Sequence, residues 1–131
     1  MRKSRVIIID DDADVRDGLG AWLAPTYEVV CFDGAETFLA SISDVRAQDA
    51  QSTCLLLDFQ MPGMNGVDLQ GRIKLLNLEY PIIFMSGNAL QSDVIDAWRG
   101  GAIDFVLNPH SPSKSLILLS GSQYFRYKSW C

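Results

Sequence analysis

Short apolar runs alternate with longer amphipathic stretches along most of this chain. The runs span four or five residues, which is too few for a helix but suits a parallel strand buried on both faces. They predict strands at residues 6–9, 28–32, 54–57, 82–85 and 104–107. Apolar residues recur every three or four positions between the runs, which predicts helices at 14–23, 35–42, 67–78 and 90–99 and a polar connection at 43–53. This alternation predicts one α/β domain with a doubly wound parallel sheet, right-handed crossovers and strand order 2-1-3-4-5.

Two of the predicted strands end in carboxylates. Asp10, Asp11 and Asp12 follow the first strand directly, and Asp58 follows the third. In the expected strand order these two strands are neighbours, and their carboxyl ends open onto the crevice where such sheets bind ligands. Carboxylates a few ångströms apart repel by roughly 1 to 4 kcal/mol per pair, so a cluster of this kind usually holds a cation. We therefore expect Asp10, Asp11 and Asp58 to converge on a cation site.

Composition narrows the class of protein. The chain has 131 residues, most simply one domain, and its 48% hydrophobic and 21% charged residues are ordinary for a soluble globular protein. A net charge of -5 with scattered Lys and Arg argues against a nucleic-acid surface, and no apolar run approaches the roughly 18 residues of a membrane span. The basic start precedes only four apolar residues, so we expect no signal peptide. Cys31 and Cys54 lie in apolar runs and are expected to be buried, in a protein of the reducing cytoplasm.

Four motifs at predicted strand ends, or in the loops that follow, carry a resemblance to a known family. They are Ile-Asp-Asp-Asp at 9–12 followed by Val15-Arg16, Leu-Asp-Phe-Gln-Met-Pro-Gly-Met-Asn-Gly at 57–66, Met-Ser-Gly at 85–87 and Gly-Ala-Ile-Asp-Phe at 101–105. In this order they resemble the receiver domain of bacterial two-component response regulators, from residue 5 to about 119, and in particular receivers that precede helix-turn-helix output domains. The resemblance implies a flavodoxin-like (βα)5 receiver domain over 1–119, with an atypical tail over 120–131.

The resemblance implies a role for each carboxylate. Asp58 is expected to accept a phosphoryl group from a histidine kinase, with Asp11 binding Mg²⁺ directly and Asp10 acting largely through a bound water. Gln60 is expected to contribute its backbone carbonyl to the same metal. A carboxylate can attack a phosphoryl group, but two anions must then approach each other, so a divalent cation has to offset their charge. On this interpretation the chain is a phosphoacceptor and not an enzyme.

Two further positions matter to the phosphorylated state that the resemblance implies. Ser86 ends the fourth predicted strand, where its hydroxyl can bond a phosphoryl oxygen, and Phe105 matches an aromatic that follows this hydroxyl inward in receivers. Receivers nearly always carry a Lys before the Pro after their fifth strand, but this chain has Asn108. Asn brings no charge, and charge-assisted hydrogen bonds are roughly twice as strong as neutral ones. The alternative is therefore a degenerate receiver that acts by phosphorylation-independent protein contacts.

The chain departs further from the family pattern after this position. His110 is the only histidine and is expected to be exposed in a loop. A last helix could begin at Ser113, but Ser-Gly-Ser at 120–122 interrupts it with weak helix formers. An altered or truncated end and a natural atypical regulator both fit this pattern.

Two other uses of the aspartates fit the residues less well. Asp10, Asp12 and Asp14 have the spacing of a calcium loop, but Val15 replaces its required Gly and Ala21 stands where its Glu belongs. We expect Asp12 and Asp14 to be solvated, with one of them at the start of the first helix. A haloacid-dehalogenase-like phosphatase also uses an Asp at a strand end, but it needs a second catalytic cluster and a cap, for which this length leaves little room.

The large apolar side chains divide between the core and the surface. Trp22 and Phe38 stand at helical spacing and are expected in the core, whereas Trp98 is expected to be partly exposed. Receivers use the helix that carries Trp98, with the strand after it, for partners or homodimers. Trp98 and Ala102 are therefore candidates for an interface, with neither nucleic acid nor membrane expected as a partner of this domain.

Overall fold

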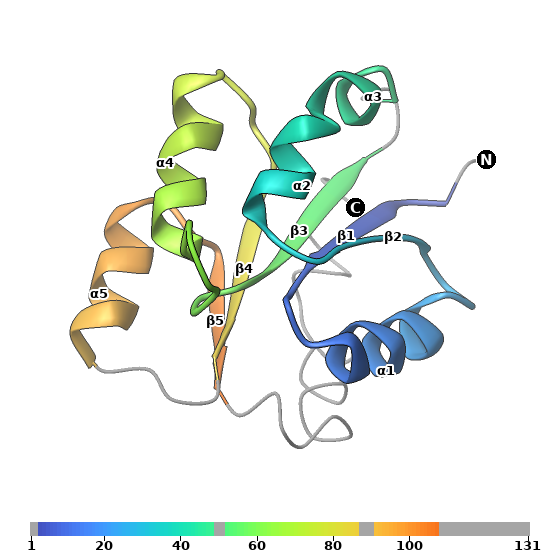
Figure 1. Ribbon diagram of the computed structural model, residues 1–131, viewed down its shortest axis with the longest axis horizontal. Coiled ribbons are helices and arrows are strands. Elements are labelled where there is room, and N and C mark those ends of the chain that lie inside the picture. Colours follow the sequence, from blue (N-terminus) through green and yellow to red (C-terminus); the bar gives the residue numbers. More distant parts are fainter. Residues whose placement is uncertain (1–2, 49–51, 87–90, 108–131) are drawn as a thin grey trace.

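The computed structural model describes residues 3–48, 52–86 and 91–107, which form a parallel sheet flanked by helices (Figure 1). Its strands are β1 (Arg5–Ile9), β2 (Glu28–Phe32), β3 (Thr53–Asp58), β4 (Ile82–Ser86) and β5 (Asp104–Leu107). Its helices are α1 (Ala13–Leu23), α2 (Ala35–Ala40), α3 (Ile42–Arg46), α4 (Gly66–Leu75) and α5 (Gln91–Arg99). All paired strands are parallel, and their order is β2-β1-β3-β4-β5. The predicted α/β class and strand order are confirmed.

The two faces of the sheet pack against different helices, because successive side chains of a strand point to opposite faces. Ile7 belongs to the core that the sheet shares with α2, α3, α4 and α5. Val6 instead packs with Leu19 and Leu23 of α1 on the other face. The central strands β1, β3 and β4 are buried along almost their whole length. Their carboxyl ends are therefore held in place by packing on both sides.

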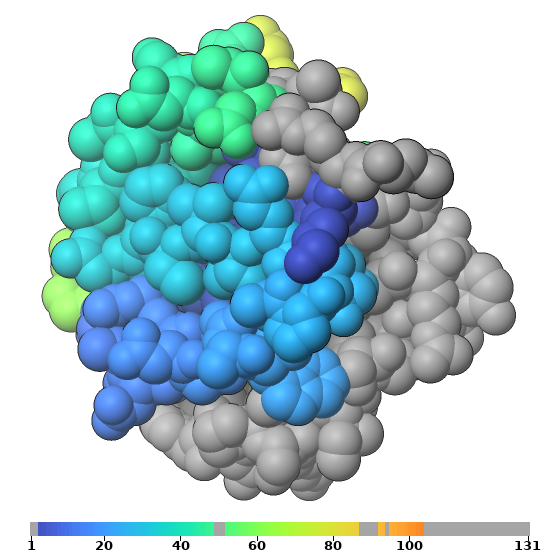
Figure 2. Space-filling view, turned by 90° about the vertical axis from the view of Figure 1, so that its right-hand side faces the viewer, coloured from blue at the N-terminus to red at the C-terminus, as the bar shows by residue number. Residues whose placement is uncertain are grey.

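Strand β2 lies at one edge of the sheet and is less covered than the central strands. Figure 2 looks onto this side of the molecule, where the segment between α1 and α2 reaches the surface. Cys54, in the middle of the sheet, is buried as predicted, but Cys31 on β2 is exposed. The prediction for Cys31 is wrong because residues 28–32 form an edge strand, as the expected order 2-1-3-4-5 implies, and the side chains of this edge strand are less covered than those of the central strands.

Helix α1 buries a narrower stripe than its apolar residues suggest. Leu19 and Leu23, one turn apart, are 3% and 2% exposed, whereas Trp22 is 41% exposed. Trp22 lies at the border of the stripe, so its prediction as a core residue is wrong. The same prediction for Phe38 of α2 is confirmed, because that side chain is fully buried.

The segment after β2 differs from its prediction. The helix expected to run to Ile42 ends at Ala40, and residues 42–46, expected to be part of a connection, form the short helix α3. Ser41 separates the two helices, with its N–H bonded to the carbonyls of Thr37 and Phe38. Val45 of α3 is 6% exposed and packs into the core, which explains why this polar stretch is helical.

Helix α4 ends three residues earlier than predicted, since Asn77 takes a left-handed conformation (φ 56°) just after its end. Leu76, which the predicted helix includes, is 39% exposed, whereas Leu69 and Ile73 within α4 are buried. Among the interface candidates, Trp98 is 48% exposed, as expected. Ala102 is only 6% exposed, because it packs into the core beneath α5, and its prediction as a surface contact is wrong.

Several predicted features lie outside the described residues. They are Asn108, His110, the helix from Ser113, the tail over 120–131 and the side chain of Phe105, whose backbone pairs with Phe84 in the sheet. Over the ranges that the structure describes, no helix is both long and apolar enough to cross a membrane.

Candidate metal centre

Three carboxylates meet at the carboxyl end of the sheet. Asp58 is the last residue of β3, and Asp10 and Asp11 follow β1, which pairs with β3 in register from Arg5 to Ile9. One ligand oxygen from each of the three side chains lies within 4.8 Å of the others. Oxygens on opposite sides of an octahedral Mg²⁺ are about 4 Å apart, so one cation could bridge this set with small side-chain movements. The predicted convergence of Asp10, Asp11 and Asp58 is confirmed.

The turn after β1 is fixed by hydrogen bonds to its own aspartates. The Asp10 N–H donates to the Phe32 carbonyl (3.2 Å), and the Asp10 carboxylate accepts from the Asp12 N–H (2.8 Å). The Asp12 carboxylate caps α1 by accepting from the Asp14 N–H (2.9 Å). Arg16 closes the turn by donating from Nη1 to the Asp10 carbonyl (2.8 Å). Of the two aspartates expected to be solvated near the start of this helix, Asp12 is therefore the one that caps it, and both are exposed.

The three carboxylates of the cluster repel one another in a site that is partly buried. Asp10 is only 3% exposed, Asp58 is half-buried and Asp11 is exposed. Burial, with the Asp10 charge beside it, raises the pKa of Asp58 to about 8. Burial also raises the pKa of Asp10. The hydrogen bond from the Asp12 N–H stabilises the ionised form and so lowers this pKa, but the effect of burial is larger. A bound divalent cation would offset the repulsion between these carboxylates. Their oxygen ligands and their negative charge therefore fit Mg²⁺.

The loop between β3 and α4 begins at the cluster. The Gln60 N–H donates to Asp58 Oδ1 (3.1 Å), and the Gly66 N–H donates to the Phe59 carbonyl (3.1 Å). A Cβ on Gly66 would lie 2.8 Å from both the Asp58 carbonyl oxygen and the Phe84 ring, so only glycine fits where α4 begins. Asn65 caps α4 by a reciprocal bond with Asp68. The loop therefore leaves Asp58 and returns to α4 along a fixed path, with Gln60 at its start.

Ser86 lies at the same end of the sheet as the cluster. It is the last residue of β4, as predicted, and it is 1% exposed. Its neighbour Met85 pairs with Asp58 in the sheet and accepts a hydrogen bond from the Phe59 N–H (2.8 Å). The sheet thus brings Ser86 to the edge that carries the carboxylates. The roles expected of Ser86 and Gln60 stay predictions.

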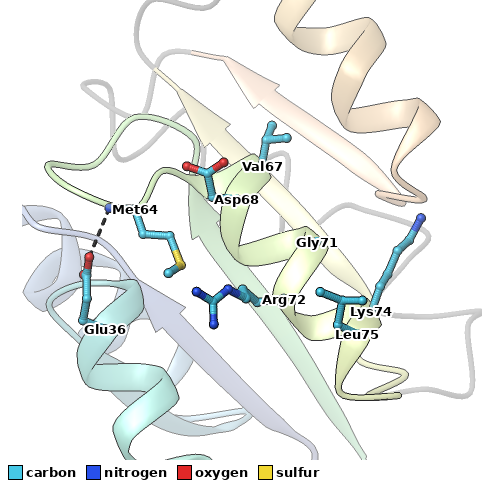
Figure 3. A pocket seen from close by; sticks show the side chains of 8 residues that line it. All are labelled: Glu36, Met64, Val67, Asp68, Gly71, Arg72, Lys74 and Leu75. Carbon is cyan, nitrogen blue, oxygen red and sulfur yellow. Dashed lines mark hydrogen bonds between the residues drawn. The ribbon is translucent and has the colours of Figure 1, made fainter.

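A separate cavity lies away from the cluster. It is an open groove of about 950 Å³ between α2 and α4, and none of the three clustered carboxylates lines it (Figure 3). Glu36 of α2 crosses one end of this groove and accepts a hydrogen bond from the Met64 N–H (3.1 Å). Sequence reasoning missed Glu36, because no spacing rule connects a helix residue with a loop 28 positions later.

Comparison with known sequences identifies similar proteins. A family model for the response regulator receiver domain matches residues 6–119. Nodulation protein W of Bradyrhizobium diazoefficiens is 35% identical over 109 residues, covering 82% of this chain and 45% of that protein. Response regulator protein TodT of Pseudomonas putida is also 35% identical over 109 residues, covering 82% and 46%. Transcriptional regulatory protein FixJ of B. diazoefficiens is 29% identical over 121 residues, covering 92% and 57%. The chain spans about half the length of these relatives.

Solved structures give the same answer for the fold. The crystal structure of FixJ-N superimposes with a TM-score of 0.72 at 28% identity, covering 93% of this chain and 97% of that one. The response regulator StyR superimposes with a TM-score of 0.70 at 32% identity, covering 95% of this chain and 64% of that one. Sequence and structure therefore agree over almost the same part of the molecule.

Proposed function

Because this chain belongs to the response regulator receiver domain family of two-component systems, we propose that it accepts a phosphoryl group on Asp58 from the phosphohistidine of a histidine kinase. The observation that supports this most is the convergence of Asp10, Asp11 and Asp58 at the carboxyl end of the sheet. We assign Asp10 and Asp11 to Mg²⁺ and place this chemistry in the cytoplasm, where histidine kinases present their phosphohistidine. On this proposal the chain is a signalling phosphoacceptor and not an enzyme with a substrate of its own.

The transfer needs an ionised Asp58. One carboxylate oxygen attacks the phosphorus, the bond from phosphorus to the imidazole nitrogen breaks, and the electron pair of that bond stays on the imidazole, which takes up a proton. Mg²⁺, when bound, offsets the charge of the phosphoryl oxygens and of the carboxylates. Burial, with the Asp10 charge beside it, raises the pKa of Asp58 to about 8, so a cation beside Asp58 is needed to stabilise its ionised form for attack at neutral pH.

The other residues at this edge hold the reacting groups in place. Asp10 is the most buried of the three carboxylates, and the Asp12 N–H fixes one of its oxygens, so it suits a supporting role. Asp58 is half-buried at the end of a central strand, and the Gln60 N–H orients its Oδ1. Ser86, on the neighbouring strand, would place its hydroxyl beside the transferred phosphoryl group.

A degenerate receiver is the second candidate, and Asn108 is the observation that favours it. The Lys that receivers carry at this position supplies a cation to the phosphoryl group, and Asn supplies hydrogen bonds without charge. In this case the chain would act through constitutive protein contacts. Helix α5 offers such a surface, because Ile95 and Trp98 are 42% and 48% exposed, and we assign a homodimer contact to it in either case.

One experiment separates the two candidates. The protein is incubated with Mg²⁺ and a small acyl-phosphate donor, and intact mass is measured for the wild type, Asp58→Asn and Asn108→Lys. The proposal expects a phosphoryl adduct in the wild type and in Asn108→Lys, and none in Asp58→Asn. An adduct only in Asn108→Lys would favour the degenerate receiver, and an adduct retained in Asp58→Asn would contradict the assignment of the acceptor.

A further inference from the structure

Two hydrogen bonds between described residues join the loop between β3 and α4 to other elements. At its start the Phe59 N–H extends the sheet by donating to the Met85 carbonyl of β4 (2.8 Å), and the bonds from Gln60 to Asp58 and from Gly66 to Phe59 are local. The Met64 N–H instead donates to Glu36 Oε1, which is 28 residues earlier on α2. We propose that Glu36 is a positioning residue for the metal site: by holding this loop it keeps the Gln60 carbonyl where Mg²⁺ binds. The inference rests on the proposed function, since it presumes that the site binds Mg²⁺.

The contact between Glu36 and the loop is close. Gly63, next to Met64, has a φ of 75°, a conformation that L side chains rarely adopt. A Cβ at Gly63 would lie 2.9 Å from Glu36 Oε1, so the carboxylate lies directly against the loop backbone. Figure 3 shows the bond spanning the gap between α2 and the loop. Glycine at 63 thus leaves room for the side chain that holds Met64.

The charge state of Glu36 suits this role. The Met64 N–H is the main reason why the pKa of Glu36 is lowered, so the side chain is ionised at neutral pH. A hydrogen bond to an ionised acceptor is shorter and stronger than one to a neutral acceptor. Glu36 also lies outside the group of three facing carboxylates, so it can hold the loop without adding a fourth ligand to the cluster.

Removing the hydrogen bond between Glu36 and Met64 should weaken Mg²⁺ binding. Gln60 is exposed and lies between Asp58 and the tied Met64, so the path of its backbone depends on both ends. Without the Glu36 bond the loop would sample more conformations, and metal binding would have to order it. Residues that hydrogen-bond to metal ligands without touching the metal typically contribute 10- to 100-fold to metal affinity. The bond from Met64 to Glu36 is exposed and four residues from Gln60, so we expect a smaller contribution of about three- to ten-fold.

The test compares Glu36→Ala with Glu36→Gln in the whole chain. Magnesium affinity is measured by isothermal titration calorimetry, and exchange of the Met64 amide by NMR, which needs no phosphoryl transfer. We expect Glu36→Ala to raise the Kd for Mg²⁺ about three- to ten-fold and to speed Met64 exchange about tenfold or more. Glu36→Gln should recover most of both, because its amide oxygen still accepts the bond. Asp44→Ala, which removes an exposed carboxylate from the neighbouring α3, serves as the charge control and should change the Kd less than about two-fold.

The contrary outcomes are distinct. If the wild type binds Mg²⁺ and Glu36→Ala binds it equally tightly, the role of Glu36 is overturned and the proposed function is untouched. If Glu36→Gln and Asp44→Ala weaken binding as much as Glu36→Ala, the effect is one of charge, and the positioning role is likewise overturned. If the wild type binds no Mg²⁺, the proposed function fails, and the inference fails with it.

Discussion

Carboxylates in two regions of this molecule experience opposite environments. At the carboxyl end of the sheet, Asp10, Asp11 and Asp58 face one another, and the pKa of Asp58 is raised to about 8. In the groove between α2 and α4, Glu36 accepts a backbone N–H, and its pKa is lowered. The groove is an open cavity of about 950 Å³, but its acidic side chains, Glu36 and Asp68, already accept hydrogen bonds from backbone N–H groups. Repulsion between carboxylates that the protein leaves uncompensated, and not the presence of a cavity, therefore indicates where a cation and a phosphoryl group would act.

The largest effect should be the pH dependence of Mg²⁺ binding. Protons compete with the metal for Asp58, whose pKa of about 8 makes it mostly protonated at pH 6 and mostly ionised at pH 9. A single competing proton predicts that affinity rises about 90-fold over this range. Calorimetric titration in buffers of constant ionic strength measures this, and Asp58→Asn should flatten most of the rise. A wild-type affinity for Mg²⁺ that does not change with pH would show that the pKa of Asp58 is not raised, and the electrostatic difference between the two regions would then not exist.

A smaller effect should appear in the stability of the metal-free protein. Because the folded pKa of Asp58 lies above its ordinary 3.8, the folded protein holds a proton between about pH 4 and pH 8 that the unfolded chain has lost, so its stability falls as pH rises through this window. Asp58→Asn cannot ionise and escapes this loss. Its free energy of unfolding should exceed that of the wild type by about 1 to 2 kcal/mol at pH 8, after solvent screening of the half-buried group, and by much less at pH 4. Urea denaturation with EDTA at both pH values gives the comparison.

Glu36→Gln is the matched control for Asp58→Asn, because the pKa of Glu36 is shifted in the opposite direction. The pKa of Glu36 is lowered in the folded state, so its ionised form contributes stability above its ordinary value of 4.5 and loses it as pH falls through the lowered value. Glu36→Gln should therefore be no more stable than the wild type at pH 8. A gain in stability like that of Asp58→Asn would mean that the two carboxylates do not differ in the way described.

The smallest effect should come from the wall of the groove. Leu75 lines the groove and is 81% exposed, so its truncation removes few contacts. Leu75→Ala should change the free energy of unfolding by less than about 0.5 kcal/mol and leave the Kd for Mg²⁺ unchanged. A clear loss of Mg²⁺ affinity would show that the groove and the carboxylate cluster act as one site.

Much of this arrangement follows from the sequence, because its main signals are local. A run such as Cys54–Leu57 has the length of a buried strand, and the aspartate that follows it must lie at the carboxyl end of the sheet. The strand order then brings Asp10 and Asp58 together. The sequence also indicated that Asp12 or Asp14 stands at the start of α1, since capping depends on neighbours only two or three residues away, and Asp12 is the cap.

The errors concern features that depend on distant parts of the chain. Cys31 is exposed because its strand lies at the edge of the sheet, and Trp22 is exposed because the stripe that α1 buries is narrow. Helix α3 forms in a polar stretch because Val45 finds a place in a core built by other elements. The bond from Glu36 to Met64 depends on how α2 and the loop meet, which no local pattern encodes.

We propose above that Asp58 is phosphorylated with help from a metal bound by its neighbours. The most direct test of this proposal is to treat the protein with an acyl-phosphate donor, with Mg²⁺ or with EDTA, and to reduce the product with borohydride, which converts an aspartyl phosphate into homoserine. Peptide mass spectrometry then locates the modified residue. We expect homoserine at position 58 with Mg²⁺ and little or none with EDTA. Homoserine at another aspartate, or equal labelling without the metal, would contradict it.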